Sequence, residues 1–484
     1  MFPLNLARII EPHEPSRTAL IDDQDLITYG DLQEWSAAIR GALHEIGIQL
    51  DDRVAVVSGN EPLFIPSLLG ALGIGARVIP ISQTSPLPEI ERKLASIEPA
   101  AVLVCPDAAW LLEHQGAFDA PFIDVNTLDL TNTDGAPPIC ERAGSDIAVM
   151  MLTSGVSGNP KIAMLSHRNL EWAQVELSGE ANAGVLEDDT VLASLPFAHI
   201  FGLNAVLLTS LRAGAKCILQ RRFDVDASID LIAEHQITIL AGAPPMWRRW
   251  SMLDVAEDAF ASVRIAASGA AALSNDVHAA MLQRHGVTIE QGYGLTETAA
   301  TVASNRGHKI RPGSVGKQIG DIEMMLVEED GTPVEVGDSG EIVVRGPNIF
   351  AGYYGSEEQT EQSLSGDGWF WTGDIGVVDD DGYLFIVDRV KDIVIVSGFN
   401  VYPAEVESIL CTHDSVTSAV VVGEPDDLTD ETVVAYVMGS VDPDELVTFA
   451  QTQLTRYKCP TRVHVVDELP IGPTGKPIRR ELRQ

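Results

Sequence analysis

Lysine is scarce in this chain. Only 8 of its 32 basic residues are lysines, and 70 acidic residues give the 484-residue chain a formal net charge of −38 at pH 7. A surface this acidic argues against nucleic acid as the main partner, because neutralising phosphates requires basic side chains. It also repels small anions, so any phosphate-binding site must carry local positive charge. The position of each lysine is therefore informative.

Cysteine is also sparse, and long apolar runs are missing. The cysteines are odd in number and form no C-x-x-C pair, so neither a zinc site nor a disulfide framework is indicated. No apolar run reaches the roughly 18–20 residues that span a bilayer, and residues 1–14 lack a secretory signal. We therefore expect a cytoplasmic protein without a transmembrane segment. The five cysteines are Cys105, Cys140, Cys217, Cys411 and Cys459.

The first half alternates short apolar strands with amphipathic stretches, a pattern typical of parallel sheets covered by helices. The spacing predicts helices over 29–47 and 86–99. A second run of this kind, over roughly 190–290, predicts a second doubly wound sheet. The predicted strands are 53–58, 76–81, 100–105, 146–152, 217–220, 237–244 and 263–270.

The pattern changes after about residue 310, where Gly-containing turns separate short alternating strands such as 340–346 and 382–388. This change predicts a small antiparallel, barrel-like β-unit. The fold class is therefore α/β: two doubly wound, mostly parallel sheets and a β-unit in a large domain over 1–388, followed by a small mobile α+β domain over 389–484.

The sharpest motif is "TSGVSGNPK", which runs from Thr153 to Lys161 directly after a predicted strand. Glycines let backbone N–H groups turn inward, hydroxyls donate further hydrogen bonds, and the lysine neutralises charge, so the segment suits a phosphate-wrapping loop. It lacks the spacing of a Walker A loop.

In this motif the chain resembles the adenylate-forming superfamily, which includes the acyl-CoA synthetases. Further segments match the family's order over essentially the whole chain: "ASGAAAL" (267–273), "QGYGLTET" (291–298), "GEIVVRGPNIFAGYY" (340–354), "GWFWTGD" (368–374), "DRVKD" (388–392), "SGFNVYPAEVE" (397–407) and "PIGPTGKPIRREL" (470–482). The resemblance implies ATP-dependent activation of a small carboxylic acid, with Mg²⁺, ATP and coenzyme A as cofactor and co-substrates. Lys161, Lys391 and Lys476 lie inside these motifs.

The resemblance also implies roles for individual residues. Tyr293 stacks on adenine, Thr296 contacts the α-phosphate, and Glu297 holds Mg²⁺. Asp374 and Arg389 bind the ribose, and Lys476 bridges the acyl carboxylate and the α-phosphate. The remaining expected ATP-binding residues are Thr153, Ser154, Gly155, Ser157, Gly158, Lys161, Gly269, Ala270, Ala271, Gly292 and Gly294.

Transfer to CoA is expected to follow a rotation of the C-terminal domain about Lys391. Gly398 and Phe399 would then line the pantetheine tunnel, where a residue without a side chain allows close approach of the thiol. Residues 456–483 hold seven basic residues, whereas 392–455 hold none. These bases are either a salt-bridged tail or a basic edge for phosphates.

Two positions depart from the family's phosphate loop, since Val156 replaces a hydroxyl residue and Ile162 replaces glycine. The segment "LPFAHIFGL" (195–203) resembles the part that lines the acid pocket, with His199 near the substrate carboxylate, although His199 could instead cap an apolar helix. The apolar pocket candidates favour a fatty acid. They are Phe197, Phe201, Leu203, Met246 and Trp247.

Three functions stay open at this point. The first is a fatty acyl-CoA synthetase. The second is the same adenylation with an aryl or succinylbenzoate-like acid, or with a carrier-protein phosphopantetheine as acceptor. The third is a binding protein that kept the fold but lost turnover.

Overall fold

The computed structural model describes residues 5–153, 161–179, 183–389, 392, 394–396, 399–401, 403–426, 430–454, 456–470 and 478–482. The chain divides into two compact units. The first comprises 1–323 and 345–370, and the second 324–344 and 371–484. Within the described part, no helix is long and apolar enough to cross a membrane.

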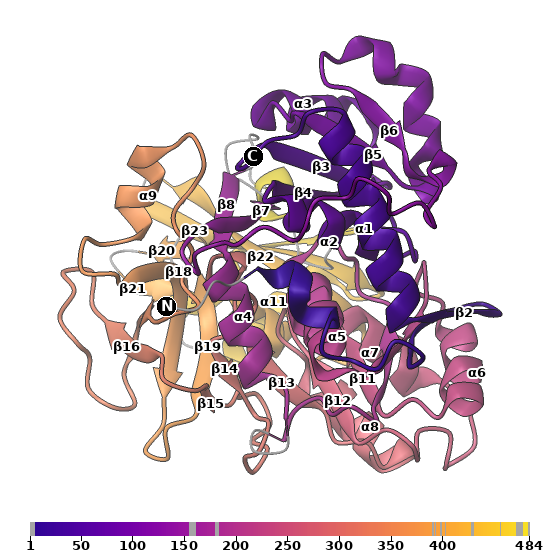
Figure 1. Cartoon of the computed structure of the whole chain (residues 1–484). Coiled ribbons are helices and arrows are strands. Elements are labelled where there is room, and N and C mark those ends of the chain that lie inside the picture. Colours follow the sequence, from indigo (N-terminus) through magenta and orange to yellow (C-terminus); the bar gives the residue numbers. More distant parts are fainter. Residues whose placement is uncertain are drawn as a thin grey trace. The chain divides into compact units, whose positions relative to one another are not determined.

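The first unit contains two large sheets, as the alternation of apolar strands and helical stretches predicts (Figure 1). The six-stranded sheet is parallel except for its last pair. Its order is β6 (Phe122–Asp124), β5 (Ala101–Val104), β3 (Arg53–Ser58), β4 (Arg77–Ser82), β7 (Ile147–Thr153) and β8 (Lys161–Ser166). Most residues of β3, β4, β5 and β7 are buried, which suits their largely apolar sequences.

The nine-stranded sheet has a parallel centre and antiparallel edges. Its order is β15 (Lys317–Gln318), β14 (Ala303–Ser304), β13 (Glu290–Tyr293), β12 (Ile265–Ser268), β11 (Ile239–Gly242), β9 (Thr190–Ala193), β10 (Lys216–Leu219), β1 (Thr18–Asp22) and β2 (Asp25–Thr28). The strands β1 and β2, far away in sequence, extend the sheet that the sequence pattern placed at 190–290.

Some helices of the first unit begin at a capping side chain. Thr28 caps α1 and Ser166 caps α4, each in a reciprocal capping box with the third helical residue. The predicted helices 29–47 and 86–99 are confirmed as α1 and α3. The bounds are α1 (Tyr29–Glu45), α2 (Phe64–Ile74), α3 (Leu87–Ile97), α4 (His167–Glu176), a π-helix (Phe201–Leu208), α5 (Thr209–Ala213), α6 (Val225–His235), α7 (Pro244–Met252), α8 (Asn275–His285) and α9 (Glu357–Ser363).

The second unit holds two smaller sheets. One is the predicted β-unit, an open four-stranded sheet of β16 (Glu323–Val327), β17 (Ser339–Arg345), β18 (Phe370–Val378) and β19 (Leu384–Arg389). The other has the order β21 (Phe399–Val401), β20 (Val394–Val396), β23 (Asp430–Gly439) and β22 (Val416–Asp426), with β24 (Arg462–Val465) also paired to β23. Its helices are α10 (Pro403–Leu410) and α11 (Pro443–Gln453).

The predicted domains and the two compact units assign some residues differently. Residues 324–344 and 371–389, which the sequence analysis placed in the large domain, belong to the same unit as the C-terminal residues. Lys391 lies outside the described residues. The boundary between 388 and 389 and the hinge at Lys391 therefore stay predictions.

Candidate functional site

The parallel strands β12 and β13 carry two of the predicted ATP-binding segments to one sheet edge. Their register pairs Ala267 with Glu290 and Ser268 with Gln291, so the residues that follow each strand leave the sheet side by side. The carboxyl edge of such a sheet is where ligands bind in α/β folds. The first segment contains Gly269, Ala270 and Ala271, and the second contains Gly292, Tyr293 and Gly294.

Gly269 lies against an aromatic ring from the π-helix. A Cβ atom at this position would be 3.1 Å from Cε1 of Phe201, so a larger residue would displace the ring. Ala270 follows with a φ of +72°, in the left-handed region that costs free energy for a residue with a side chain. This strained backbone turns the chain sharply at the end of β12, and Tyr293 is half-buried at the end of the neighbouring strand.

A tight turn follows β13 and carries Thr296 and Glu297. The backbone N–H of Leu295 donates to Oγ1 of Thr298 at 2.9 Å, and residues 296–298 form a 3-10 helix. Ala299 and Ala300 then adopt φ values of +53° and +87°. The turn folds back onto Gly294, where a Cβ atom would lie 2.1 Å from the carbonyl oxygen of Ala300. Only glycine fits there.

Buried asparagines hold this turn in place. Nδ2 of Asn348 donates to the carbonyl oxygens of Thr298 and Thr301, at 3.3 and 2.8 Å. Asn204, on the π-helix, donates to the carbonyl oxygen of Ala299 at 3.0 Å and accepts from Nε2 of Gln174 at 2.9 Å. Buried carbonyls need such partners, because an unsatisfied one costs about 1–3 kcal/mol. No residue pattern in the sequence predicts the contacts of these asparagines.

Glu297 is buried, with 8% of the residue exposed. Its Oε1 accepts a 2.7 Å hydrogen bond from the hydroxyl of Tyr353, and its carbonyl oxygen accepts from the N–H of Phe350 at 2.9 Å. Burial and the neighbouring carboxylate raise the pKa of Tyr353, so its hydroxyl remains a donor. Nζ of Lys161 lies 4.5 Å from the centroid of the same ring. The expected metal ligand and the expected phosphate lysine therefore contact one side chain.

The donor set around Glu297 fits Mg²⁺. Within the described ranges, no group of three or more His, Cys, Asp or Glu side chains could hold a metal ion. Mg²⁺ seldom needs such a cage, since it is commonly bound by one or two carboxylates together with substrate phosphates and water. The hydrogen bond from Tyr353 leaves the second carboxylate oxygen of Glu297 for a cation.

The two residues that flank the phosphate-loop motif, Thr153 and Lys161, are paired on the adjacent strands β7 and β8. Thr153 ends β7 opposite Lys161, and its hydroxyl donates to the carbonyl oxygen of Lys161 at 3.3 Å. Ser154, Gly155, Val156, Ser157 and Gly158 lie outside the described residues. Ile162 is buried in the core below this sheet, which accounts for an apolar residue where the family has glycine.

Asn60, which follows β3 of the six-stranded sheet, forms hydrogen bonds with the segment that contains His199. No sequence motif pointed to this residue. Asn60 donates to the carbonyl oxygen of Leu195 at 2.9 Å and accepts from the N–H of Phe197 at 3.0 Å. His199 is partly buried, and this burial, together with Lys93, lowers its pKa. A neutral imidazole is therefore expected at pH 7.

Most of the apolar residues predicted to line the acid pocket are buried. Phe197, Leu203, Met246 and Trp247 are buried, whereas Phe201 is half-buried. Nε1 of Trp247 donates to the carbonyl oxygens of Gly242 and Ala267, at 3.0 and 3.2 Å. Those bonds tie the tryptophan to the ends of β11 and β12.

Asp374 lies in the second unit, on β18, and is 4% exposed. Its N–H donates to Oγ1 of Thr372 at 3.1 Å, and its register partner on β19 is Arg389, whose side chain lies outside the description. Glu341 accepts from the N–H of Gly373 at 2.9 Å. Burial and the nearby Asp374 raise the pKa of Glu341. The register brings the two predicted ribose residues opposite each other.

The residues that flank the segment with Lys476 are bonded to each other. Residues 471–477 lie outside the described part, but the N–H of Ile478 donates to the carbonyl oxygen of Pro470 at 2.8 Å. Arg479 then binds both carboxylate oxygens of Glu407, at 2.7 and 3.0 Å, and lies 3.7 Å from Oδ2 of Asp392. Arg479, which follows this segment, thus lies close to Asp392, the residue after the expected hinge.

The basic segment near the C-terminus is partly neutralised. Lys458 binds both carboxylate oxygens of Glu405 at 2.8 Å, Arg462 pairs with Glu424, and Arg479 pairs with Glu407. These three residues are salt-bridged, as the first of the two interpretations predicted. Gly398 lies outside the described residues, and Phe399 is on β21 with its side chain outside the description.

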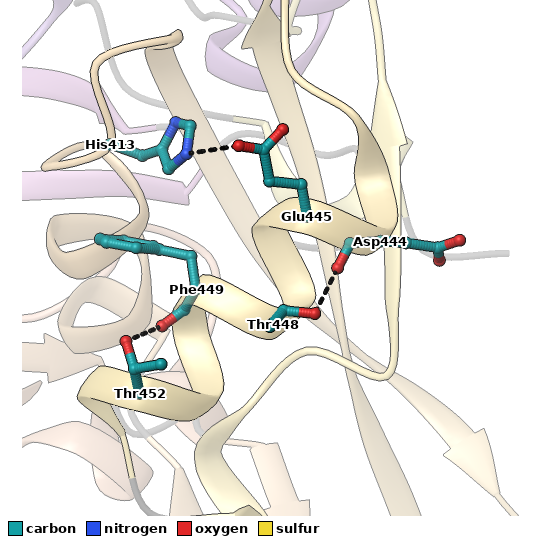
Figure 2. Close-up of a pocket in the computed structure, with 6 residues that line it drawn as sticks. All are labelled: His413, Asp444, Glu445, Thr448, Phe449 and Thr452. Atoms are coloured by element: carbon teal, nitrogen blue, oxygen red, sulfur yellow. Dashed lines mark hydrogen bonds and ion pairs between the residues drawn. The ribbon is translucent and has the colours of Figure 1, made fainter.

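A shallow depression on α11 has none of the predicted site residues in its lining (Figure 2). His413 approaches Glu445 to 3.8 Å across it and packs edge-on against Phe449. Its lining is mainly acidic and hydroxylic, which does not suit phosphates. The lining residues are His413, Asp444, Glu445, Thr448, Phe449 and Thr452.

Comparison with known proteins supplies independent evidence. Residues 11–354 match the AMP-binding enzyme family, and residues 405–476 match the AMP-binding enzyme C-terminal domain. The chain is 33% identical over 495 residues to a feruloyl-CoA synthase from Amycolatopsis sp, covering 100% of this chain and 98% of that protein. It is 34% identical over 500 residues to 4-coumarate–CoA ligase 3 from Oryza sativa subsp. japonica, covering 97% and 89%.

Solved structures agree with these relatives. This chain is similar to ATP-bound MatB from Rhodopseudomonas palustris, with a TM-score of 0.91 and 29% identity. The match covers 99% of this chain and 98% of the MatB chain. An anthranilate CoA ligase in complex with anthranoyl-AMP has a TM-score of 0.89 at 25% identity, with 100% and 97% covered. The chain belongs to the AMP-binding enzyme family.

Proposed function

We propose that this protein uses ATP to convert a carboxylic acid to an acyl-adenylate with release of pyrophosphate, and then forms a thioester with coenzyme A. The observation that carries the proposal is the buried Glu297 carboxylate, bonded to Tyr353 beneath Lys161 at the exit of the phosphate loop. It places one acceptor for a cation and one ammonium group on a single side chain. Mg·ATP needs both groups, because its Mg²⁺ ion binds a carboxylate and its phosphates bind an ammonium group.

The chemistry explains the remaining residues. The acid carboxylate attacks an already anionic α-phosphorus, so the barrier is electrostatic and positional. Mg²⁺, when bound, neutralises phosphate charge. Thr296 contacts the α-phosphate, Asp374 and Arg389 hold the ribose, and Lys476 bridges the acid and the α-phosphate. The adenine occupies the edge formed by Gly269, Ala270 and Tyr293.

For the acid, we propose an aromatic propenoate of the hydroxycinnamate class. The relatives at 33–34% identity are named for ferulate and coumarate, whereas a Mycobacterium tuberculosis fatty acyl CoA synthetase shares 25% identity at a TM-score of 0.77. The half-buried ring of Phe201 beside Gly269 offers an aromatic partner for a planar acid. The fatty acid that the sequence pattern favoured remains the competing substrate.

Coenzyme A is the proposed acceptor because the named relatives are CoA ligases. Rotation about Lys391 would replace Lys476 by the Gly398–Phe399 face, which admits the pantetheine thiol. The salt bridges of Lys458, Arg462 and Arg479 weaken the idea that a basic edge selects CoA through its phosphates.

An ATP–pyrophosphate exchange assay over a panel of acids tests the first step. We expect exchange with hydroxycinnamates and weaker exchange with fatty acids. Exchange with fatty acids alone would contradict the aromatic assignment, and no exchange with any acid would favour a binding protein without turnover. Adding CoA or a phosphopantetheinylated carrier protein then identifies the acceptor by the thioester formed.

Two substitutions test the assigned roles. Lys476→Ala should abolish exchange but spare thioester formation from supplied acyl-adenylate, since it acts only in adenylation. Asp374→Ala should weaken ATP binding. Lys309→Ala removes an exposed lysine outside all motifs and serves as the charge control. Equal loss of both half-reactions in Lys476→Ala, or unchanged ATP affinity in Asp374→Ala, would contradict the respective role.

A further inference from the structure

Two consecutive tyrosines, Tyr353 and Tyr354, have different surroundings. Tyr353 is buried and donates to Glu297, whereas Tyr354 packs against the hydrophobic core of the six-stranded sheet, with the guanidinium of Arg53 5.4 Å from its ring centroid. The neighbouring side chains point to opposite faces of the segment, as in a strand. The pair therefore offers one tyrosine in the site and a matched one outside it.

The backbone around Tyr353 is fixed to the strand that begins at Lys161. The N–H of Met164 donates to the carbonyl oxygen of Gly352 at 3.0 Å, and the N–H of Tyr354 donates to that of Ile162 at 2.8 Å. These bonds add residues 351–354 to the edge of β8. The ring of Tyr353 is thereby held against Lys161.

The other side of the same segment is fixed to the turn that carries Glu297. The N–H of Phe350 donates to the carbonyl oxygen of Glu297, and the Phe350 ring packs edge-on against Tyr353 at 4.8 Å. The N–H of Tyr353 donates to Oγ1 of Thr360 at 2.9 Å. Tyr353 has little freedom to rotate, so its hydroxyl can define the orientation of the carboxylate.

We propose that Tyr353 is a positioning residue for Mg·ATP, an inference that rests on the proposed function. Its hydroxyl holds one oxygen of Glu297 and so aims the other at Mg²⁺, while its ring face keeps the Lys161 ammonium beside the phosphates. Partners that orient a metal ligand commonly contribute about 10–100-fold to metal affinity. The hydroxyl should therefore matter only when Mg²⁺ is present, and the ring should matter with or without it.

Isothermal titration calorimetry of ATP, with Mg²⁺ or with EDTA, separates these contributions. Tyr353→Phe keeps the ring, so ATP affinity in EDTA should match the wild type, while the gain in affinity on adding Mg²⁺ should shrink about 10-fold. Tyr353→Leu should also lose affinity in EDTA. Tyr354→Phe is the matched control and should behave as the wild type. Thermal unfolding of each variant shows whether the site is still folded.

A double substitution excludes a purely structural role. In a Glu297→Gln background, Tyr353→Phe should cause no further loss of the Mg²⁺-dependent gain in ATP affinity, because the carboxylate that the Tyr353 hydroxyl orients is gone. Three results for Tyr353→Phe would overturn this inference but not the proposed function. They are an equal loss of ATP affinity with and without Mg²⁺, an unchanged gain in affinity on adding Mg²⁺, and an equally large effect in the Glu297→Gln background. A wild-type protein that binds no ATP would overturn the proposed function as well.

Discussion

Replacing Gly294 by alanine tests whether adenylation depends on the position of the turn that carries Glu297. The added Cβ would lie 2.1 Å from the carbonyl oxygen and 2.4 Å from the carbonyl carbon of Ala300, whereas real Cβ atoms essentially never approach another heavy atom within 3.0 Å. The Ala300 carbonyl must therefore retreat by about 1 Å. It cannot do so freely, because Asn204 and Asn348 hold the carbonyl groups on either side of it.

Two magnitudes follow for Gly294→Ala. Overpacking of this kind typically costs about 1–3 kcal/mol of stability. A displacement of about 1 Å in a catalytic group can cost about 10²-fold in rate, so the larger effect should be on ATP–pyrophosphate exchange. Urea unfolding measures the first effect, and exchange at saturating ATP measures the second.

The controls are two other glycines. Gly116 and Gly366 have open space where a Cβ atom would be added and no positive φ, so alanine at either should change stability and exchange little. Wild-type exchange by a folded Gly294→Ala variant would refute the claim that this turn positions the chemistry.

Three further predictions concern other parts of the chain. Burial, with Arg142 adding to it, lowers the pKa of His167 to about 4, and the N–H of Leu6 donates to its Nδ1. The unfolded chain then binds more protons between about pH 6.5 and 4, so stability should fall by up to about 3 kcal/mol as pH drops through that window. His167→Gln should flatten this slope in urea unfolding, and an unchanged slope would contradict the assignment. Arg479→Ala should lower adenylation about 10-fold or more, because it removes the ion pair with Glu407 that holds the residues next to the Lys476 segment. Arg456→Ala, which changes an exposed arginine of the same basic segment, should leave adenylation unchanged, and equal effects of the two substitutions would argue against this role of Arg479. Iodoacetamide should modify exposed Cys411 first in the native protein, because burial raises the pKa of Cys105 and Cys217 to about 12; early labelling of either, read by peptide mass spectrometry, would contradict the described burial.

The elements that the sequence predicted best are those whose signals are local. The apolar run at 53–58 is β3, and Thr28 with Asp31 fixes the start of α1 through a capping box that involves only neighbouring residues. The membership of β1 and β2 in the sheet that contains β10 was not predictable, since it depends on pairing between residues about 200 positions apart.

The candidate site divides in the same way. Glu297, Gly294 and Lys161 are visible in motifs, because their chemistry requires particular residue types at particular spacings. The residues that hold them are Asn204, Asn348 and Tyr353, which come from distant segments. Asn348 and Tyr353 lie inside the quoted motif 340–354, but the motif does not show which residues they contact. The apolar pocket candidates stay predictions, since Trp247 and Leu203 are buried and burial suits a core residue as well as a pocket residue.

The central claim is that the acid attacks the α-phosphorus of ATP, and oxygen isotope transfer tests it most directly. An acid labelled with oxygen-18 at both carboxylate oxygens would be incubated with the protein, ATP, Mg²⁺ and CoA, and the products analysed by mass spectrometry. The account predicts that one labelled oxygen leaves with AMP while the other remains in the acyl thioester. Label in inorganic phosphate, with ADP as the nucleotide product, would place the attack at the γ-phosphorus and contradict the account.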